Sequence, residues 1–151
     1  EETVGAARAA LGDLLGTDPR GVVVGRSMTA LTFEMARTLA QGWGPGDEVV
    51  VAERSHIYHY EGAAPAALWG VQLRPVGDAS GVLTADDVEA VVQGTHDWEA
   101  RTRLVCLENT VNKAGGVAVS MDAITPVADL IADLVSEYEE AVGRMNKTLG
   151  G

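Results

Sequence analysis

Apolar residues along the chain follow two spacings that alternate, one typical of helices and one typical of buried strands. Residues 3–16 place apolar side chains three or four positions apart and end at a glycine, so they predict a helix. The segment GVVVG at 21–25 is a β-branched run between glycines, which predicts a buried strand. Residues 28–43 return to helical spacing and predict a second helix, with apolar residues at Leu31, Met35 and Leu39.

Three more strands are predicted downstream, because short apolar runs recur between polar and turn residues. They are EVVVAE at 48–53, VQLRPV at 71–76 and TRLVCLEN at 102–109. Residues 57–69 predict a helix that Pro65 kinks or restarts, and a further helix is predicted with Thr84 as its N-cap. An apolar face over 122–142, with Pro126 in the first turn, predicts the last helix.

Strands and helices thus alternate, and the connections between strands are long enough for helical crossovers. The sequence therefore predicts one α/β domain over residues 1–151, with a mostly parallel sheet flanked by helices. In such sheets, ligands bind at the carboxyl ends of the strands. We expect the site to be built from the polar segments that follow the predicted strands, at 25–29, 53–56 and 108–116.

Composition narrows the classes of function. The chain is 46% hydrophobic and 22% charged, which is typical of a globular protein, and its net charge of −11 argues against a nucleic-acid surface. Cys106 is the only cysteine, so an internal disulfide and a multi-cysteine zinc site are excluded, and its apolar surroundings favour a buried thiol. No apolar run approaches the ~20 residues of a membrane span, and the start lacks the features of a signal peptide. We expect a cytoplasmic protein without membrane contact.

The segment GRSMTALTF puts Ser27, Met28 and Thr29 at the start of the second predicted helix. Backbone N–H groups, hydroxyls and the positive end of a helix dipole suit a phosphate group. A plain N-cap by Ser27 or Thr29 explains the same residues equally well. Neither a P-loop nor a GxGxxG pattern is present, so a nucleotide is not specifically indicated.

The segment SHIYHYE at 55–61 collects two of the three histidines of the chain. His56 follows a strand closely enough to stack on a planar ligand, although a satisfied polar side chain is the commoner role. The spacing of His56, His59 and Glu61 does not bring all three onto one helix face, so no metal site is predicted. A Ser/His/Asp hydrolase is disfavoured because GxSxG is absent. The loop CLENTVNKAGG at 106–116 fits a ligand site and a solvated turn equally well.

Three segments in this order resemble the threonine aldolase family of β-eliminating lyases: SHIYHYEGAAPAALWGVQLRPV, LTADDVEAVV and ARTRLVCLENTVNKAGGVAVSMDAI. The resemblance covers residues 47–130, while residues 13–51 are more similar to class V, cysteine-desulfurase-like proteins of the same fold. It implies part of the large domain of the aspartate aminotransferase fold (fold type I). It also implies pyridoxal 5′-phosphate as cofactor, an amino-acid substrate and a homo-oligomer.

The resemblance implies roles for single residues as well. Ser27, Met28 and Thr29 match the loop that holds the cofactor phosphate. His56 matches the histidine that stacks on the pyridine ring and helps with proton transfer near the substrate, and Glu61 matches an acid close to that site. The implied reaction breaks the Cα–Cβ bond of a β-hydroxy-α-amino acid, which for threonine gives glycine and acetaldehyde.

Three features depart from the family pattern. Val111 stands where the family has a histidine, and such a group contributes ~10²–10⁴-fold where it is used in acid–base catalysis. The aspartate that pairs with the ring nitrogen is not identifiable, because Asp129 and Asp133 lie on the predicted last helix. Lys113 and Lys147 are the only lysines, and Lys147, in NKTLGG, has a faint similarity to the family's Schiff-base segment.

These departures keep three interpretations open. The first is an amino-terminal portion or shortened relative of a threonine-aldolase-type lyase, with weak or no activity alone and with His56, Glu61 and Lys147 as catalytic candidates. The second is a cysteine-desulfurase-like enzyme. The third is a non-catalytic fragment that binds a cofactor or a partner.

Overall fold

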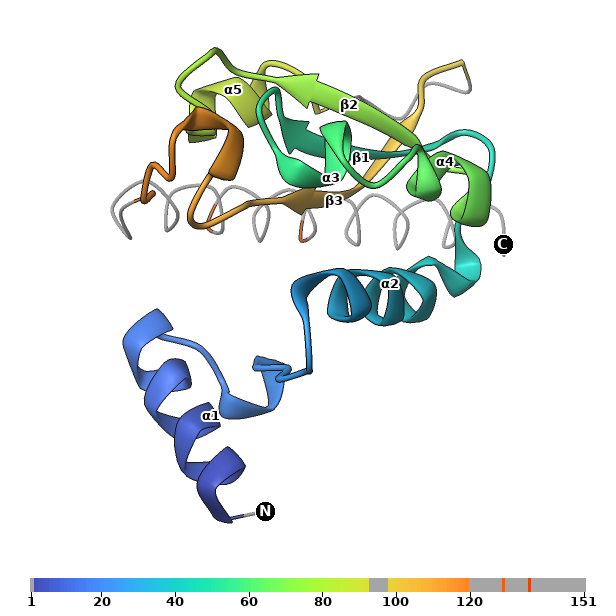
Figure 1. Ribbon diagram of the computed structural model, residues 1–151. Helices are drawn as coiled ribbons and strands as arrows, with labels where there is room; N and C mark the ends of the chain where they lie inside the picture. The colour runs from blue at the N-terminus through green and yellow to red at the C-terminus, as the bar shows by residue number, and fades with distance from the viewer. Residues whose placement is uncertain (1, 93–97, 120–128, 130–135, 137–151) are drawn as a thin grey trace.

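A computed structural model describes residues 2–92, 98–119, 129 and 136 of the chain. Its described part contains a parallel sheet of three strands in the order β2-β1-β3 (Figure 1). The strands are β1 (Asp47–Ala52), β2 (Gln72–Val76) and β3 (Arg101–Cys106), and β1 pairs with both neighbours. The predicted α/β class with a parallel sheet is confirmed.

Strand β1 forms the centre of the core, because all six of its residues are buried. Val50 and Ala52 pack on one side of the sheet with Leu83 and Val88. Val49 and Val51 alternate with them and pack on the other side with Val71, since successive side chains of a strand point to opposite faces. A continuous apolar run is therefore what a strand covered on both faces requires.

Between residues 2 and 119, the described part of the chain forms five α-helices that surround the sheet or precede it (Figure 1). They are α1 (Glu2–Leu15), α2 (Met28–Leu39), α3 (His56–His59), α4 (Ala64–Trp69) and α5 (Ala85–Glu89), with single 3-10 turns η1 (Pro19–Gly21), η2 (Ala40–Gly42) and η3 (Asn112–Ala114). Helix α2 packs against α4, where the rings of Phe33 and Trp69 meet edge to face at 6.4 Å.

The predicted helix over 57–69 is divided into α3 and α4. The chain turns between them at Gly62 and Ala63, which both have positive φ. Pro65 then lies in the first turn of α4 and is buried, a position where its missing N–H is not needed. The proline therefore restarts the helix, which was one of the two expected outcomes.

The predicted strand over 21–25 is wrong. These residues run as unpaired chain between η1 and α2, and Val23 and Val24 are each 47% exposed. A β-branched run favours an extended backbone, but a strand also needs a neighbour to satisfy its backbone groups. No described strand lies beside this segment (Figure 1). The helix predicted over 122–142 falls mainly outside the described residues, although Asp129 is helical and exposed.

Helix α1 exposes the apolar positions from which it was predicted. It packs onto η1 through Gly12, where a Cβ would come within 2.9 Å of the Thr17 carbonyl oxygen. Its larger apolar side chains remain more than one-third exposed: Val4, Leu11, Leu14 and Leu15. The helical spacing was a correct guide to the secondary structure, but the face has no partner within the described part of the chain.

Buried acidic residues at the start of β1 tie the three strands together. Glu48 is 1% exposed, accepts a 2.8 Å hydrogen bond from Thr102 of β3 and lies 3.6 Å from Arg74 of β2. Asp47 accepts from Arg103 at 2.9 Å and lies 3.1 Å from Arg101. Buried carboxylates need such partners because desolvation is costly.

Asp47 gives the fold an acid-sensitive contact. Burial by itself raises the pKa of Asp47, but the hydrogen bonds from Arg103 and the Gly44 N–H, with the charges of Arg103 and Arg101, lower it overall. The stability from this depressed pKa is present above the unfolded-state pKa of ~3.9 and is lost as the pH falls through the folded value. In Asp47→Asn, we expect the free energy of unfolding, measured by urea titration, to decrease less steeply below pH ~4 than in the wild-type chain. An unchanged pH dependence would contradict this assignment.

Thr84 caps α5 as the sequence predicted. Its hydroxyl accepts the Asp87 N–H at 3.2 Å, and the Asp87 carboxylate accepts the Thr84 N–H at 3.0 Å, so the two form a capping box. We expect Thr84→Ala to lower the free energy of unfolding by about 1 kcal/mol in urea. Thr84→Ser keeps the hydroxyl and is the matched control. Equal losses for both variants would refute the role of the cap.

Candidate active site at the carboxyl end of the sheet

The carboxyl ends of β1 and β3 bring together two of the three polar segments expected to form a site. The Glu108 carboxylate joins them, because Oε2 accepts the N–H of His56 and Oε1 accepts the N–H of Asn112 at 3.0 Å. His56 begins α3, and Asn112 begins η3. One side chain therefore fixes the starts of two turns that follow neighbouring strands, at the left edge of the sheet in Figure 1.

His56 and Glu61, both implied by the resemblance to belong to the site, form a pair. His56 Nε2 lies 3.3 Å from Glu61 Oε1, and the Glu61 side chain is only 8% exposed. An ionised carboxylate only accepts hydrogen bonds, so it selects the ring form with a hydrogen on Nε2. In the neutral ring the acceptor is then Nδ1, which is buried and has no hydrogen-bond partner within the described ranges.

The ring of His56 lies beside Tyr60, with centroids 4.9 Å apart and planes tilted by 40°. Its side chain is about one-quarter exposed. A buried nitrogen without a partner costs free energy. A ligand that gave Nδ1 a hydrogen bond would therefore stabilise the site. This is the chemistry expected of a histidine that orients a ring ligand or handles a proton.

His59 and Lys113 form a second contact that sequence reasoning missed. The sequence pattern gives neither residue a role in the site. His59 Nδ1 lies 3.0 Å from Lys113 Nζ, and its Nε2 lies 2.7 Å from the Glu53 carbonyl oxygen. Lys113 Nζ also lies 5.6 Å from the centre of the Tyr60 ring. The available signal was the placement of both residues in segments that follow strands.

Val111, at the position where the family has a histidine, is a buried core residue. It is 1% exposed, and its N–H donates to the Val117 carbonyl oxygen at 2.8 Å. A Cβ on Gly81 would come within 2.7 Å of Val111 Cγ1. The valine therefore fills the space where two loops meet, and its apolar methyl groups supply neither an acid nor a base.

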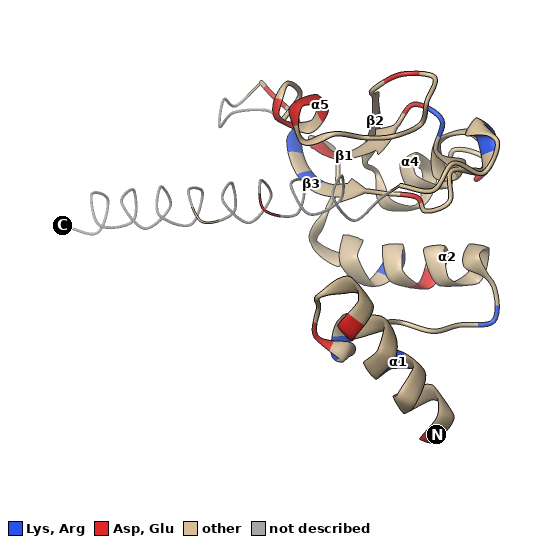
Figure 2. Ribbon diagram, turned by 90° about the vertical axis from the view of Figure 1, so that its left-hand side faces the viewer, with Lys and Arg blue, Asp and Glu red and all other residues tan. Residues whose placement is uncertain are grey.

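The segment at 25–29 begins α2 on the side to which the carboxyl ends of the strands point (Figure 1), the side that faces the viewer in Figure 2. Ser27 is the N-cap, and its hydroxyl accepts the Ala30 N–H at 3.2 Å. The expected N-cap is thus confirmed, while a phosphate role for Ser27, Met28 and Thr29 stays a prediction. Within the described residues, no hydrogen bond joins this segment to the other two.

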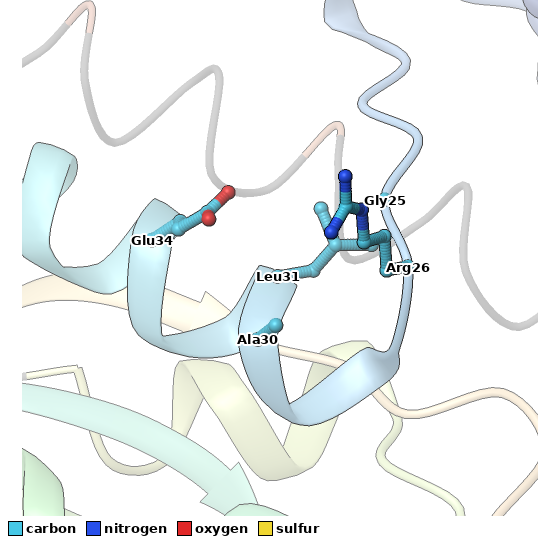
Figure 3. Close-up of a pocket in the computed structure, with 5 residues that line it drawn as sticks. All are labelled: Gly25, Arg26, Ala30, Leu31 and Glu34. Carbon is cyan, nitrogen blue, oxygen red and sulfur yellow. The ribbon is translucent and has the colours of Figure 1, made fainter.

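A pocket of about 380 Å³ adjoins the start of α2 (Figure 3). The side chains of Arg26 and Glu34 lie at its two sides, with Leu31 between them (Figure 3). A Cβ on Gly25 would come within 2.5 Å of the Leu31 side chain, so glycine is required where the chain passes the helix. The pocket is lined by Gly25, Arg26, Ala30, Leu31 and Glu34.

Cys106 ends β3 beside this site and is half-buried, so the expected core position is correct only in part. Burial raises the pKa of its thiol, and the negative charge of Glu108 raises it further. Its thiol is therefore held in the less nucleophilic form.

The remaining candidate, Lys147, lies outside the described residues, as does Asp133 of the predicted last helix. Over the ranges that the structure describes, no three His, Cys, Asp or Glu side chains gather as metal ligands. In the same ranges, no helix is long and apolar enough to span a membrane.

Residues 32–134 match the profile of the family described as Beta-eliminating lyase. Probable low-specificity L-threonine aldolase 2 of Arabidopsis thaliana is 33% identical over 88 residues, which are 56% of this chain and 25% of that protein. Low-specificity L-threonine aldolase 1 of the same plant is 29% identical over 108 residues, 70% of this chain and 26% of that protein. Low specificity L-threonine aldolase of Escherichia coli (strain K12) is 35% identical over 68 residues, 44% and 20% of the two chains. The chain thus spans about a fifth to a quarter of the length of these relatives.

Proposed function

The chain belongs to the beta-eliminating lyase family, whose profile it matches over residues 32–134, and from this premise we propose that it forms part of a pyridoxal-phosphate-dependent carbon–carbon lyase of threonine-aldolase type. The substrate would be a β-hydroxy-α-amino acid and the products glycine and an aldehyde. The relatives support this reaction because their names describe low-specificity threonine aldolases.

One observation carries the proposal to this chain's own residues. His56 stands at the carboxyl end of the central strand with Nε2 3.3 Å from Glu61 and with Nδ1 buried and without a partner among the described residues. A histidine held in this way suits a planar ring ligand and a proton near the substrate. Glu61 acts through it as a positioning residue, because its carboxylate selects the tautomer and fixes the ring.

Two groups of residues in this chain suit the cofactor. The first is the start of the twelve-residue helix α2, where Ser27 and Thr29 hydroxyls and backbone N–H groups suit a phosphate. The second is His56, whose ring would stack on the pyridine. When bound, the cofactor supplies the electron sink that breaking a Cα–Cβ bond requires. Lys147 is proposed as the lysine that holds the cofactor, as the similarity of its segment to the family's implies.

A cofactor titration of the chain tests this function. We expect pyridoxal 5′-phosphate to bind, as followed by its absorbance, and we expect His56→Ala to weaken binding while the far-ultraviolet circular dichroism is unchanged. Threonine cleavage, measured as glycine and acetaldehyde, should be weak in the chain alone, because Val111 supplies no imidazole. Absence of any cofactor affinity in the folded wild-type chain would overturn the proposal.

The similarity of residues 13–51 to cysteine-desulfurase-like proteins supports one alternative activity. Alanine release from cysteine, with no glycine from threonine, would favour it. The half-buried Cys106 is poorly suited to carry sulfur, since its thiol pKa is raised. A homo-oligomer is proposed for either activity, because α1 exposes apolar side chains that a second copy would cover.

A further inference from the structure

Lys113 and His59 meet at the site edge in a contact that the proposed function does not use. Lys113 is the only lysine among the described residues, and its Nζ lies 3.0 Å from His59 Nδ1. The two residues are 54 positions apart and come from the segments that follow β3 and β1. Their meeting is therefore a product of the fold.

The other nitrogen of His59 fixes the form of its ring. Nε2 lies 2.7 Å from the carbonyl oxygen of Glu53, which can only accept a hydrogen bond, so Nε2 carries the hydrogen. In the neutral ring, Nδ1 then has a lone pair directed at Lys113. When that nitrogen takes a proton from the ammonium, the Nε2–H bond to the Glu53 carbonyl is kept. The contact thus has the geometry of an amine beside its own base.

The surroundings of Lys113 hold this amine in place. Its Nζ lies 5.6 Å from the centre of the Tyr60 ring, and its side chain is half-buried. The turn η3 that carries it is anchored by the Asn112 N–H, which donates to Glu108. An amine positioned beside a base loses little freedom when it reacts, which favours nucleophilic attack.

We propose that Lys113 is an imine-forming amine for aldehydes, with His59 as the base that receives its proton. The ammonium of Lys113 gives a proton to His59 Nδ1, and the free amine attacks the carbonyl carbon. The C–N bond forms as the C–O π bond breaks, and the oxygen takes the proton back from His59. Transfer of a second proton from nitrogen releases this oxygen as water. Amine and aldehyde thus give imine and water, without a change of oxidation state.

Reductive labelling with acetaldehyde and cyanoborohydride tests this inference without any cofactor. Peptide mass spectrometry measures ethylation at Lys113 and at Lys147, so the second lysine of the chain is an internal reference. At neutral pH and limiting reagent, we expect labelling of Lys113 to exceed that of Lys147 on the order of tenfold. In the urea-unfolded chain the two should label equally, because the neighbouring base is gone.

Substitution of His59 separates proton transfer from simple positioning. His59→Asn keeps a side chain that can accept a hydrogen bond from Lys113 but has no basic nitrogen. In this variant, we expect the excess labelling of Lys113 over Lys147 to disappear while the circular dichroism spectrum is unchanged. Lys113→Arg should lose its own adduct and leave labelling of Lys147 as it was.

Two results would overturn the inference. One is equal labelling of the lysines in the folded wild-type chain, a measurement that needs no variant to fold. The other is an undiminished excess in His59→Asn, which would mean that His59 only positions the amine. The two proposals can fail separately, because acetaldehyde labelling requires no pyridoxal phosphate, and a cofactor titration of Lys113→Arg removes any contribution of Lys113 to the absorbance.

Discussion

Replacing Glu108 with alanine should lower the free energy of unfolding by about 1–3 kcal/mol, because two backbone N–H groups lose their acceptor at once. The Glu108 carboxylate receives the N–H groups of His56 and Asn112, and these begin the turns that carry the candidate site. Urea unfolding would give the loss. Amide hydrogen exchange should show where this stability is lost, with faster exchange at these two positions than at β1.

Two further substitutions sharpen this test. Glu108→Gln keeps the shape, but its NH₂ group cannot accept from the second N–H, so we expect a smaller loss than in Glu108→Ala. It also removes the charge that raises the pKa of Cys106, so thiol labelling should become faster. Glu53→Ala changes an exposed acid at the same edge and should cost less than ~0.5 kcal/mol. A cost in Glu53→Ala equal to that in Glu108→Ala would show that the bridge contributes nothing specific.

Replacing Gly81 with alanine should destabilise the chain by about 2–4 kcal/mol, from two separate causes. Gly81 has φ +74°, a conformation that costs an L-residue about 1–2 kcal/mol. Its new Cβ would also come within 2.7 Å of Val111 Cγ1, 3.1 Å of Ala114 Cβ and 3.2 Å of Arg54 Cβ. These contacts join the loop before α5 to both turns of the candidate site.

Gly115 provides a matched control for this substitution. It has φ +81°, but nothing lies within 4 Å of where its Cβ would be. Gly115→Ala therefore measures the backbone cost alone, and the difference from Gly81→Ala measures the overlap. In the double variant Gly81→Ala with Val111→Ala, we expect a loss smaller than the sum of the single losses. Equal losses in the two glycine variants would refute the close approach.

Sequence patterns predicted those parts of the fold that depend on near neighbours along the chain. The buried run of β1 and the Thr84 N-cap of α5 are local, and both were predicted. The segment at 21–25 has the same β-branched character as β1, yet it pairs with no described strand, because pairing depends on what the rest of the chain places beside it. Propensity could not distinguish the two.

The candidate site follows the same division. His56 and Glu61 are five positions apart, and the family resemblance implied that both belong to the site. The bridges from Glu108 to His56 and from Lys113 to His59 span 52 and 54 positions, so only the crossover between parallel strands creates them. The sequence indicated which strand ends would meet, but not which atoms.

The strand order β2-β1-β3 has a consequence for synthesis of the chain. The central strand leaves the ribosome before either of its neighbours exists. The partner of Asp47 in β3, Arg103, follows 56 positions later. It therefore emerges roughly 3–11 s after Asp47 at 5–20 residues per second. Strand β2, which pairs with one edge of β1 and carries Arg74 for Glu48, emerges earlier in that interval, but Asp47 and the other edge of β1 remain without their β3 partners until its end. The rate of translation therefore sets how long this buried apolar strand lacks its second neighbour.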